Sequence, residues 1–178
     1  GDASFKGSTG NLKLARPIVG MTTTKTGNGY WMVASDGGIF SFGDAGFFGS
    51  TGSIKLNKPI VDIAPTPSGR GYWMAASDGG IFSFGDAAFY GSTGAIKLAK
   101  RIQQMAATPS GEGYWLVAAD GGVFAFDAPF RGSMGAVRLN KPVTGMVPYG
   151  NGYLMVGEDG GIFNFSNRSF LGSLGANP

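Results

Sequence analysis

Short apolar runs alternate with clusters of turn-forming residues along the whole chain. None of the runs has a 3.6-residue apolar period long enough for a helix, so the chain is predicted to be all-β. In the second copy of the pattern we expect four short antiparallel strands joined by tight turns, at residues 59–64, 72–77, 81–84 and 89–92. An Asp-Gly-Gly step, which is a strong hairpin signal, separates the second strand from the third.

The predicted strands are apolar on both faces. Tyr72, Trp73 and Met74 are consecutive, and residues 30–33 show the same run in the first copy. A sheet with one solvated face would alternate apolar and polar residues. We therefore expect each sheet to be covered on both sides.

The pattern is an internal repeat. Asp36, Asp78 and Asp120 open the Asp-Gly-Gly steps at a spacing of 42 residues, and Asp159 follows after 39. Stacked four-stranded units of about 40 to 45 residues are typical of β-propeller blades. We predict a β-propeller with four-stranded blades, most simply four-bladed, and one repeat domain over residues 1–178, with copies at about 3–44, 45–86, 87–127 and 128–178. A β-trefoil needs three copies, and a β-solenoid lacks the hairpin turns.

The two ends of the repeat are irregular. A Phe-x-Gly-Ser motif occurs five times, whereas every other predicted strand occurs four times, so a strand from either end could complete the last blade. The last copy departs from the others at Leu154, Asn167 and Leu174, as terminal capping repeats often do. We expect the C-terminus to be genuine and the N-terminus to be a processed end or a cut from a longer array. The five motifs are residues 5–8, 47–50, 89–92, 130–133 and 170–173.

Composition limits the chemistry. The chain has no cysteine and no histidine, which excludes disulfides, Cys/His zinc sites and a histidine general base. Of the acidic residues, only Glu112, Glu158 and Asp62 fall outside the repeated sets, so we expect neither an enzyme nor a cofactor. No apolar run approaches the 18 residues of a membrane span.

Two acidic series follow the repeat. The first, at the Asp-Gly-Gly steps, could form a ring of carboxylates around a cation, but Asp before Gly also caps tight turns. We favour turn capping for this series and also for the second one, and predict no metal site. The first series is Asp36, Asp78, Asp120 and Asp159, and the second is Asp2, Asp44, Asp86 and Asp127.

A basic pair recurs in each copy, in the connection that follows a Gly-Ser-Thr-Gly segment or the related Gly-Ser-Met-Gly at residues 132–135. If the repeats form a ring, these connections emerge on one face and give a circle of positive charge, which could hold an anionic polymer such as a teichoic acid or an acidic polysaccharide. The alternative is a solvated connection that keeps the protein soluble. The eight candidate ligand-binding residues are Lys13, Arg16, Lys55, Lys58, Lys97, Lys100, Arg138 and Lys141.

Three tryptophans follow the Gly-Tyr step. Aromatic faces stack on sugar rings, so Trp31, Trp73 and Trp115 are candidate sugar-stacking residues. A Trp in the middle of a strand, between Tyr and an aliphatic residue, is also typical of a core between blades, and we favour that interpretation.

The string Gly-Tyr-Trp-Met-Val-Ala-Ser-Asp-Gly-Gly-Ile-Phe-Ser-Phe-Gly-Asp-Ala, followed by Phe-x-Gly-Ser-Thr-Gly, resembles repeats of exported actinobacterial proteins. Such repeats often lie beside peptidase, esterase or peptidoglycan-hydrolase domains. The resemblance covers essentially the whole chain, and it implies a propeller-like accessory role in an extracellular or cell-envelope setting. It supplies no site residues.

Two functional hypotheses follow. The first is a non-catalytic extracellular binding module that recognises a cell-wall or other anionic glycopolymer through its basic face. The second is a structural or assembly scaffold that spaces or oligomerises attached domains, with the chain itself as a homo-oligomer. We expect no nucleic-acid partner.

Overall fold

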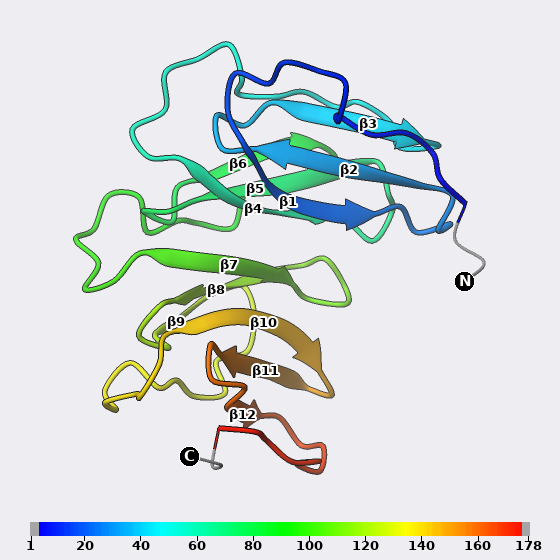
Figure 1. Cartoon of the computed structure of the whole chain (residues 1–178). Coiled ribbons are helices and arrows are strands. Elements are labelled where there is room, and N and C mark those ends of the chain that lie inside the picture. The colour runs from blue at the N-terminus through cyan, green and yellow to red at the C-terminus, as the bar shows by residue number, and fades with distance from the viewer. Residues whose placement is uncertain (1–3, 176–178) are drawn as a thin grey trace. The chain divides into compact units, whose positions relative to one another are not determined.

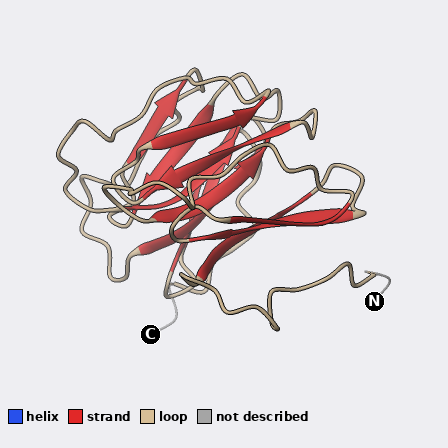
Figure 2. Ribbon diagram, turned by 90° about the horizontal axis from the view of Figure 1, so that it is seen from above, coloured by secondary structure: helices blue, strands red, loops and turns tan. Residues whose placement is uncertain are grey.

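The computed structural model describes residues 4–175, and over that range it contains strands and loops but no helix (Figure 2). The strands of the first two repeats are β1 (Ile18–Thr23), β2 (Gly29–Ala34), β3 (Ile39–Gly43), β4 (Ile60–Pro65), β5 (Gly71–Ala76) and β6 (Ile81–Gly85). Those of the last two are β7 (Ile102–Ala107), β8 (Tyr114–Ala118), β9 (Val123–Phe126), β10 (Val143–Tyr149), β11 (Gly152–Gly157) and β12 (Ile162–Phe165).

Each repeat forms one antiparallel sheet of three strands in chain order. The Gly-Tyr-Trp strand lies in the middle and pairs with both neighbours, so that Trp73 faces Ala64 on one side and Ser83 on the other. The four sheets, here called the first to the fourth sheet, confirm the predicted all-β fold built from four blades.

The chain divides into two compact units with two sheets each. In the first unit β4 packs on β1 and β2, and in the second β10 packs on β7 and β8 (Figure 1). Each unit has its own apolar core between its two sheets. The first core contains Trp31, Val33, Ile60, Ile63, Tyr72, Met74 and Ala76. The second contains Ala106, Trp115, Val117, Val143, Met146, Tyr153 and Met155.

The predicted fourth strand of each blade is wrong, because none of the five Phe-x-Gly-Ser segments is a strand in residues 4–175. The buried Tyr72 hydroxyl holds one of them: it accepts a hydrogen bond from Phe48 N (3.2 Å) and donates one to Gly49 O (2.6 Å). Gly49 has a φ of 135°, in the region that favours glycine, and its Cα lies against the ring of Phe84. A side-chain clamp from the following sheet therefore replaces the sheet ladder.

The clamp recurs at each later tyrosine. Tyr114 binds Gly91 O, and Tyr153 binds Gly132 O, both at 2.6 Å. Tyr30 donates to Gly7 O, so residues 5–8 occupy the corresponding place on the first sheet. For the fifth motif, residues 170–173, no equivalent tyrosine bond is found within residues 4–175, and a Cβ at its Gly172 would meet open space.

Candidate functional site

The basic connections are anchored on the Asp-Gly-Gly turns. Thr51 N donates to Gly37 O, and the Thr51 hydroxyl donates to Asp36 O, each at 3.1 Å. Thr93 makes the equivalent bonds to Gly79 O and Asp78 O in the next repeat. The chain then turns and carries its basic pair to the start of the next sheet.

In the first unit this arrangement forms a surface hollow of about 400 Å³. Arg16 comes from one connection, Lys55 and Lys58 come from the next, and Asp36 comes from the turn between them. Ile60 N donates to Ser35 O at 2.9 Å and joins the two sheets at this point. Three cationic side chains and one carboxylate therefore share a single site.

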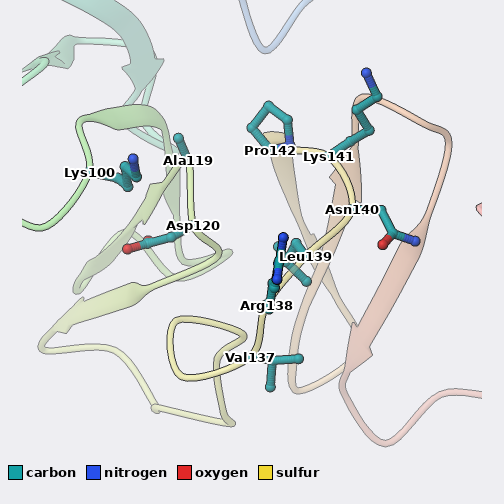
Figure 3. A pocket seen from close by; sticks show the side chains of 9 residues that line it. All are labelled: Lys100, Ala119, Asp120, Val137, Arg138, Leu139, Asn140, Lys141 and Pro142. Atoms are coloured by element: carbon teal, nitrogen blue, oxygen red, sulfur yellow. The ribbon is translucent and has the colours of Figure 1, made fainter.

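The second unit repeats the site at the equivalent positions. Lys100, Arg138 and Lys141 line a hollow of about 400 Å³ together with Asp120. In Figure 3, Lys100 and Asp120 lie on one side of the hollow, and Arg138 and Lys141 come from the connection on the other side. Here Val143 N donates to Ala119 O at 2.9 Å, the same joint between sheets. We call these two sites the basic hollows.

The electrostatic balance of each basic hollow is positive. All six cationic side chains are exposed. The only ion pair found in residues 4–175, between Arg70 and Asp86 at 3.6 Å, lies outside both hollows. The carboxylates of the hollows are engaged by their own turns, since Asp36 accepts from Gly38 N and Asp120 from Gly122 N, both at 3.0 Å. The cations are thus free to meet an anion.

Six of the eight predicted basic residues are brought together in these two groups of three. Lys13 and Lys97 do not line either hollow. The predicted circle of charge across all four repeats stays a prediction.

The Asp-Gly-Gly aspartates cap their turns, as expected. Each accepts a hydrogen bond from the backbone N–H two residues further on, at 3.0 Å, and they are Asp36, Asp78, Asp120 and Asp159. The part of the chain that the structure describes holds no group of three or more metal-ligating side chains.

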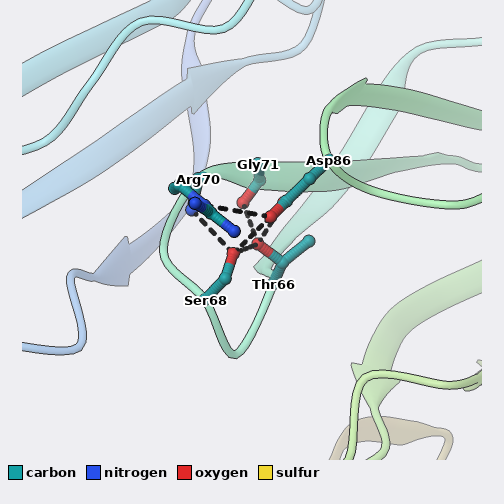
Figure 4. A network of polar contacts seen from close by, with 5 residues as sticks. All are labelled: Thr66, Ser68, Arg70, Gly71 and Asp86. Atoms are coloured by element: carbon teal, nitrogen blue, oxygen red, sulfur yellow. Dashed lines mark hydrogen bonds and ion pairs between the residues drawn. The ribbon is translucent and has the colours of Figure 1, made fainter.

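The second acidic series anchors a different turn. Thr66 and Ser68 donate to Asp86 at 2.8 and 2.5 Å, and Arg70 pairs with the same carboxylate (Figure 4). The hydrogen bond from Ser68 is the main cause that lowers the pKa of Asp86, supported by the bond from Thr66 and the charge of Arg70. Bonds from Thr26 and Thr24 likewise lower the pKa of Asp44.

Asp127, the last member of that series, differs from Asp44 and Asp86. Asp127 takes the position that Gly43 and Gly85 occupy in earlier repeats, with a φ of 45°, because its copy is one residue shorter. It is the only non-glycine residue with positive φ in residues 4–175. Asp2 lies outside the described residues.

The sugar-stacking hypothesis for the tryptophans is wrong. Trp31, Trp73 and Trp115 are 0%, 1% and 2% exposed. Their indole N–H groups donate to backbone carbonyls of Gly46, Ala88 and Pro129 at 2.6, 2.7 and 3.0 Å. Each indole ring is buried in the core, and its N–H group bonds to the segment that follows its own sheet, so neither face of the ring is open to a sugar.

A third hollow, of about 300 Å³, escaped the sequence analysis. It lies at the fourth sheet and is lined by Arg131, Asn151, Asn164, Ser166 and Asn167. Asn151 and Asn167 bond reciprocally, backbone N–H to side-chain oxygen, at 3.2 and 2.9 Å. The sequence signal for this hollow was Asn167, which stands where earlier repeats have Asp, but this difference alone does not indicate what the hollow could bind.

Comparison with known proteins supports the fold class. The chain is similar to the β-propeller domain of Cps50 (Swd1) from Myceliophteria thermophila, with a TM-score of 0.55 and 10% sequence identity. The match covers 84% of this chain and 52% of that one, so the chain spans about half the length of its structural relative. No family model and no curated protein matches the sequence. Within residues 4–175 no helix is long and apolar enough to cross a membrane.

Proposed function

We propose that this chain is a non-catalytic binding module that holds an anionic glycopolymer in its two basic hollows. The observation that carries the proposal is the recurrence of one site: three exposed cations, one turn-bound aspartate and an asparagine, built by equivalent residues in both units. A solvated connection would not need these groups to converge twice on a hollow.

The chemistry of the hollows fits a polymer with spaced negative charges. Lys55, Lys58 and Arg16 can pair with phosphate or carboxylate groups, while Asn57 offers an amide to sugar hydroxyls. Two copies of a weak site on one chain can bind a repeating polymer more tightly than either site alone.

The proposed setting is extracellular or the cell envelope, where such polymers occur, as the resemblance to exported actinobacterial repeats implies. The proposed role is recognition without chemistry. The perturbed carboxylates, Asp44 and Asp86, belong to turn networks rather than to either basic hollow.

The test is binding of poly(glycerol phosphate), with uncharged dextran and duplex DNA as comparison probes, measured by calorimetry at rising salt. We expect binding of the polyphosphate that weakens steeply with ionic strength, because screening shortens to about 8 Å at physiological salt. Replacing Lys55, Lys58, Arg138 and Lys141 with Ala removes two cations from each hollow. At about 0.2–1 kcal/mol per exposed pair, the four substitutions should lower affinity by about fourfold to several hundredfold.

A charge-matched control replaces four basic residues outside both hollows, Lys6, Lys25, Arg101 and Arg168, with Ala. Its binding should change much less, and both variants should melt close to the wild-type temperature. Equal loss in the two variants would mean that net charge alone attracts the polymer. No binding of any polyanion at low salt would overturn the proposal.

The second candidate function, an assembly scaffold, is favoured by a separate observation. Positions that are core in other sheets are exposed on the first and fourth sheets, including Met21 and Val147.

A further inference from the structure

The first sheet exposes a set of apolar positions that are buried elsewhere. Met21 faces Met32 in the register of β1 and β2, as Ile63 faces Met74 in the second sheet. Met21 is 62% exposed, whereas Ile63 is 4% and the equivalent Met146 is 2% exposed. We call Ile18, Met21, Tyr30 and Met32 the leading face.

The fourth sheet has the complementary exposure. Val147 pairs with Leu154 as Ala106 pairs with Trp115 in the third sheet. Val147 is 54% exposed, but Ala106 is 6% exposed. We call Val147, Leu154 and Val156 the trailing face.

The two units show what covers such faces. In the first unit Trp31 and Val33, on the trailing side of one sheet, pack on Ile60, Ile63 and Tyr72, on the leading side of the next. In the second unit Ala106, Trp115 and Val117 cover Val143, Met146 and Tyr153 in the same way. Aromatic contacts mark both junctions: Trp31 and Tyr72 have ring centres 5.9 Å apart, and Trp115 and Tyr153 are 5.3 Å apart.

A polar contact accompanies each junction. The Phe-x-Gly-Ser segment that follows one sheet is clamped by the tyrosine of the next sheet, as Tyr72 and Tyr153 show. Residues 170–173 are such a segment, unclamped by any tyrosine in the described part of the chain, and Phe170, Leu171 and Leu174 are all exposed. On the first sheet the tyrosine, Tyr30, is held by residues 5–8.

We propose that the leading face binds the trailing face of a second copy of this chain, and that residues 170–173 of that copy displace residues 5–8 from Tyr30. The contact is head-to-tail, because the two surfaces differ and each matches one side of the junctions inside the units. Association of this kind continues from copy to copy until it closes.

Sedimentation velocity between about 1 µM and 1 mM, the range of weak dissociation constants, tests the proposal. The wild-type mass should rise with concentration above that of one chain. Met21→Glu and Val147→Glu should each raise the dissociation constant by about tenfold or more, since a central apolar contact is lost. Ile96→Glu, a change at an equally exposed apolar residue in a connection, should behave as wild type.

Mixing the two variants distinguishes a head-to-tail contact from other modes. The Met21→Glu copy keeps an intact trailing face and the Val147→Glu copy keeps an intact leading face, so the mixture should form dimers and nothing larger. A symmetric contact would not be restored by mixing. A wild type that stays at one chain mass throughout would show that the leading and trailing faces do not bind one another between copies, and either result overturns the proposal. Should a Glu variant melt early, Met21→Gln and Val147→Gln provide the same comparison.

Gly7→Val tests the displacement step. A side chain at Gly7 collides with the ring of Phe42, so residues 5–8 should leave Tyr30. Association should then tighten by about fivefold, the worth of one hydrogen bond no longer in competition. Unchanged or weaker association would show that residues 170–173 do not take that site.

Discussion

Removing the Tyr72 hydroxyl should destabilise the first unit by more than the loss of one hydrogen bond, because this one group makes two. The side chain is fully buried, and the hydroxyl makes two bonds, one accepted from Phe48 N at 3.2 Å and one donated to Gly49 O at 2.6 Å. Each bond contributes about 1 kcal/mol net, and backbone groups left without a partner add to the loss. We expect Tyr72→Phe to lower the free energy of unfolding by about 2–3 kcal/mol, or the melting temperature by about 4–12 °C.

The assay is urea unfolding followed by tryptophan fluorescence, with Tyr149→Phe as the control. Tyr149 has one long bond, 3.4 Å to Ser169 O, and its loss should cost less than about 0.5 kcal/mol. If Tyr72→Phe costs no more than Tyr149→Phe, the clamp does not hold the segments, and the replacement of a fourth strand by side-chain bonds is wrong.

Three further outcomes follow from the same contacts. Asp127→Gly should raise stability by about 0.5–1 kcal/mol in thermal melts, because glycine adopts the φ of 45° without strain; a loss would show that the Asp127 carboxylate has a structural role. The lowered pKa of Asp86 contributes stability above its ordinary value of about 3.9, and this is lost as pH falls through the lowered pKa. Asp86→Asn should therefore be less stable than wild type at pH 7, but it should lose less stability than wild type between about pH 5 and pH 2, where carboxyl groups titrate. An acid profile of stability parallel to that of wild type would contradict this. Burial raises the pKa of Tyr114 and Tyr153, so the stability that these two groups contribute is fully present below about pH 10 and is lost as pH rises through their raised pKa values. Melting temperatures that stay constant above that pH would count against buried clamps.

The hairpins could be predicted from the sequence because their signals are local. The Asp-Gly-Gly step and the apolar runs placed β5 and β6 within a residue of their observed bounds, Gly71–Ala76 and Ile81–Gly85. Residues 89–92 look equally strand-like, but their backbone groups are taken by Tyr114, which lies in the next sheet. A bond of that kind is set by tertiary packing, and no local pattern encodes it.

The candidate site was predicted as a set of residues but not as a grouping. The repeat placed Lys55 and Lys58 in one connection and Arg16 in the one before. That they converge on Asp36 depends on how the second sheet packs on the first, which the spacing of the residues does not determine. The role of the tryptophans, in contrast, could be predicted from the sequence. Their burial makes them core residues, and the apolar run around Trp73 already indicated that burial.

The most direct test of the binding account is an NMR titration of the ¹⁵N-labelled chain with poly(glycerol phosphate) at low salt. The account predicts that amide signals around Lys55, Lys58, Arg138 and Lys141 shift together and return when salt is added. Shifts confined to the hollow around Asn151 and Asn167, or no shifts at all, would contradict it.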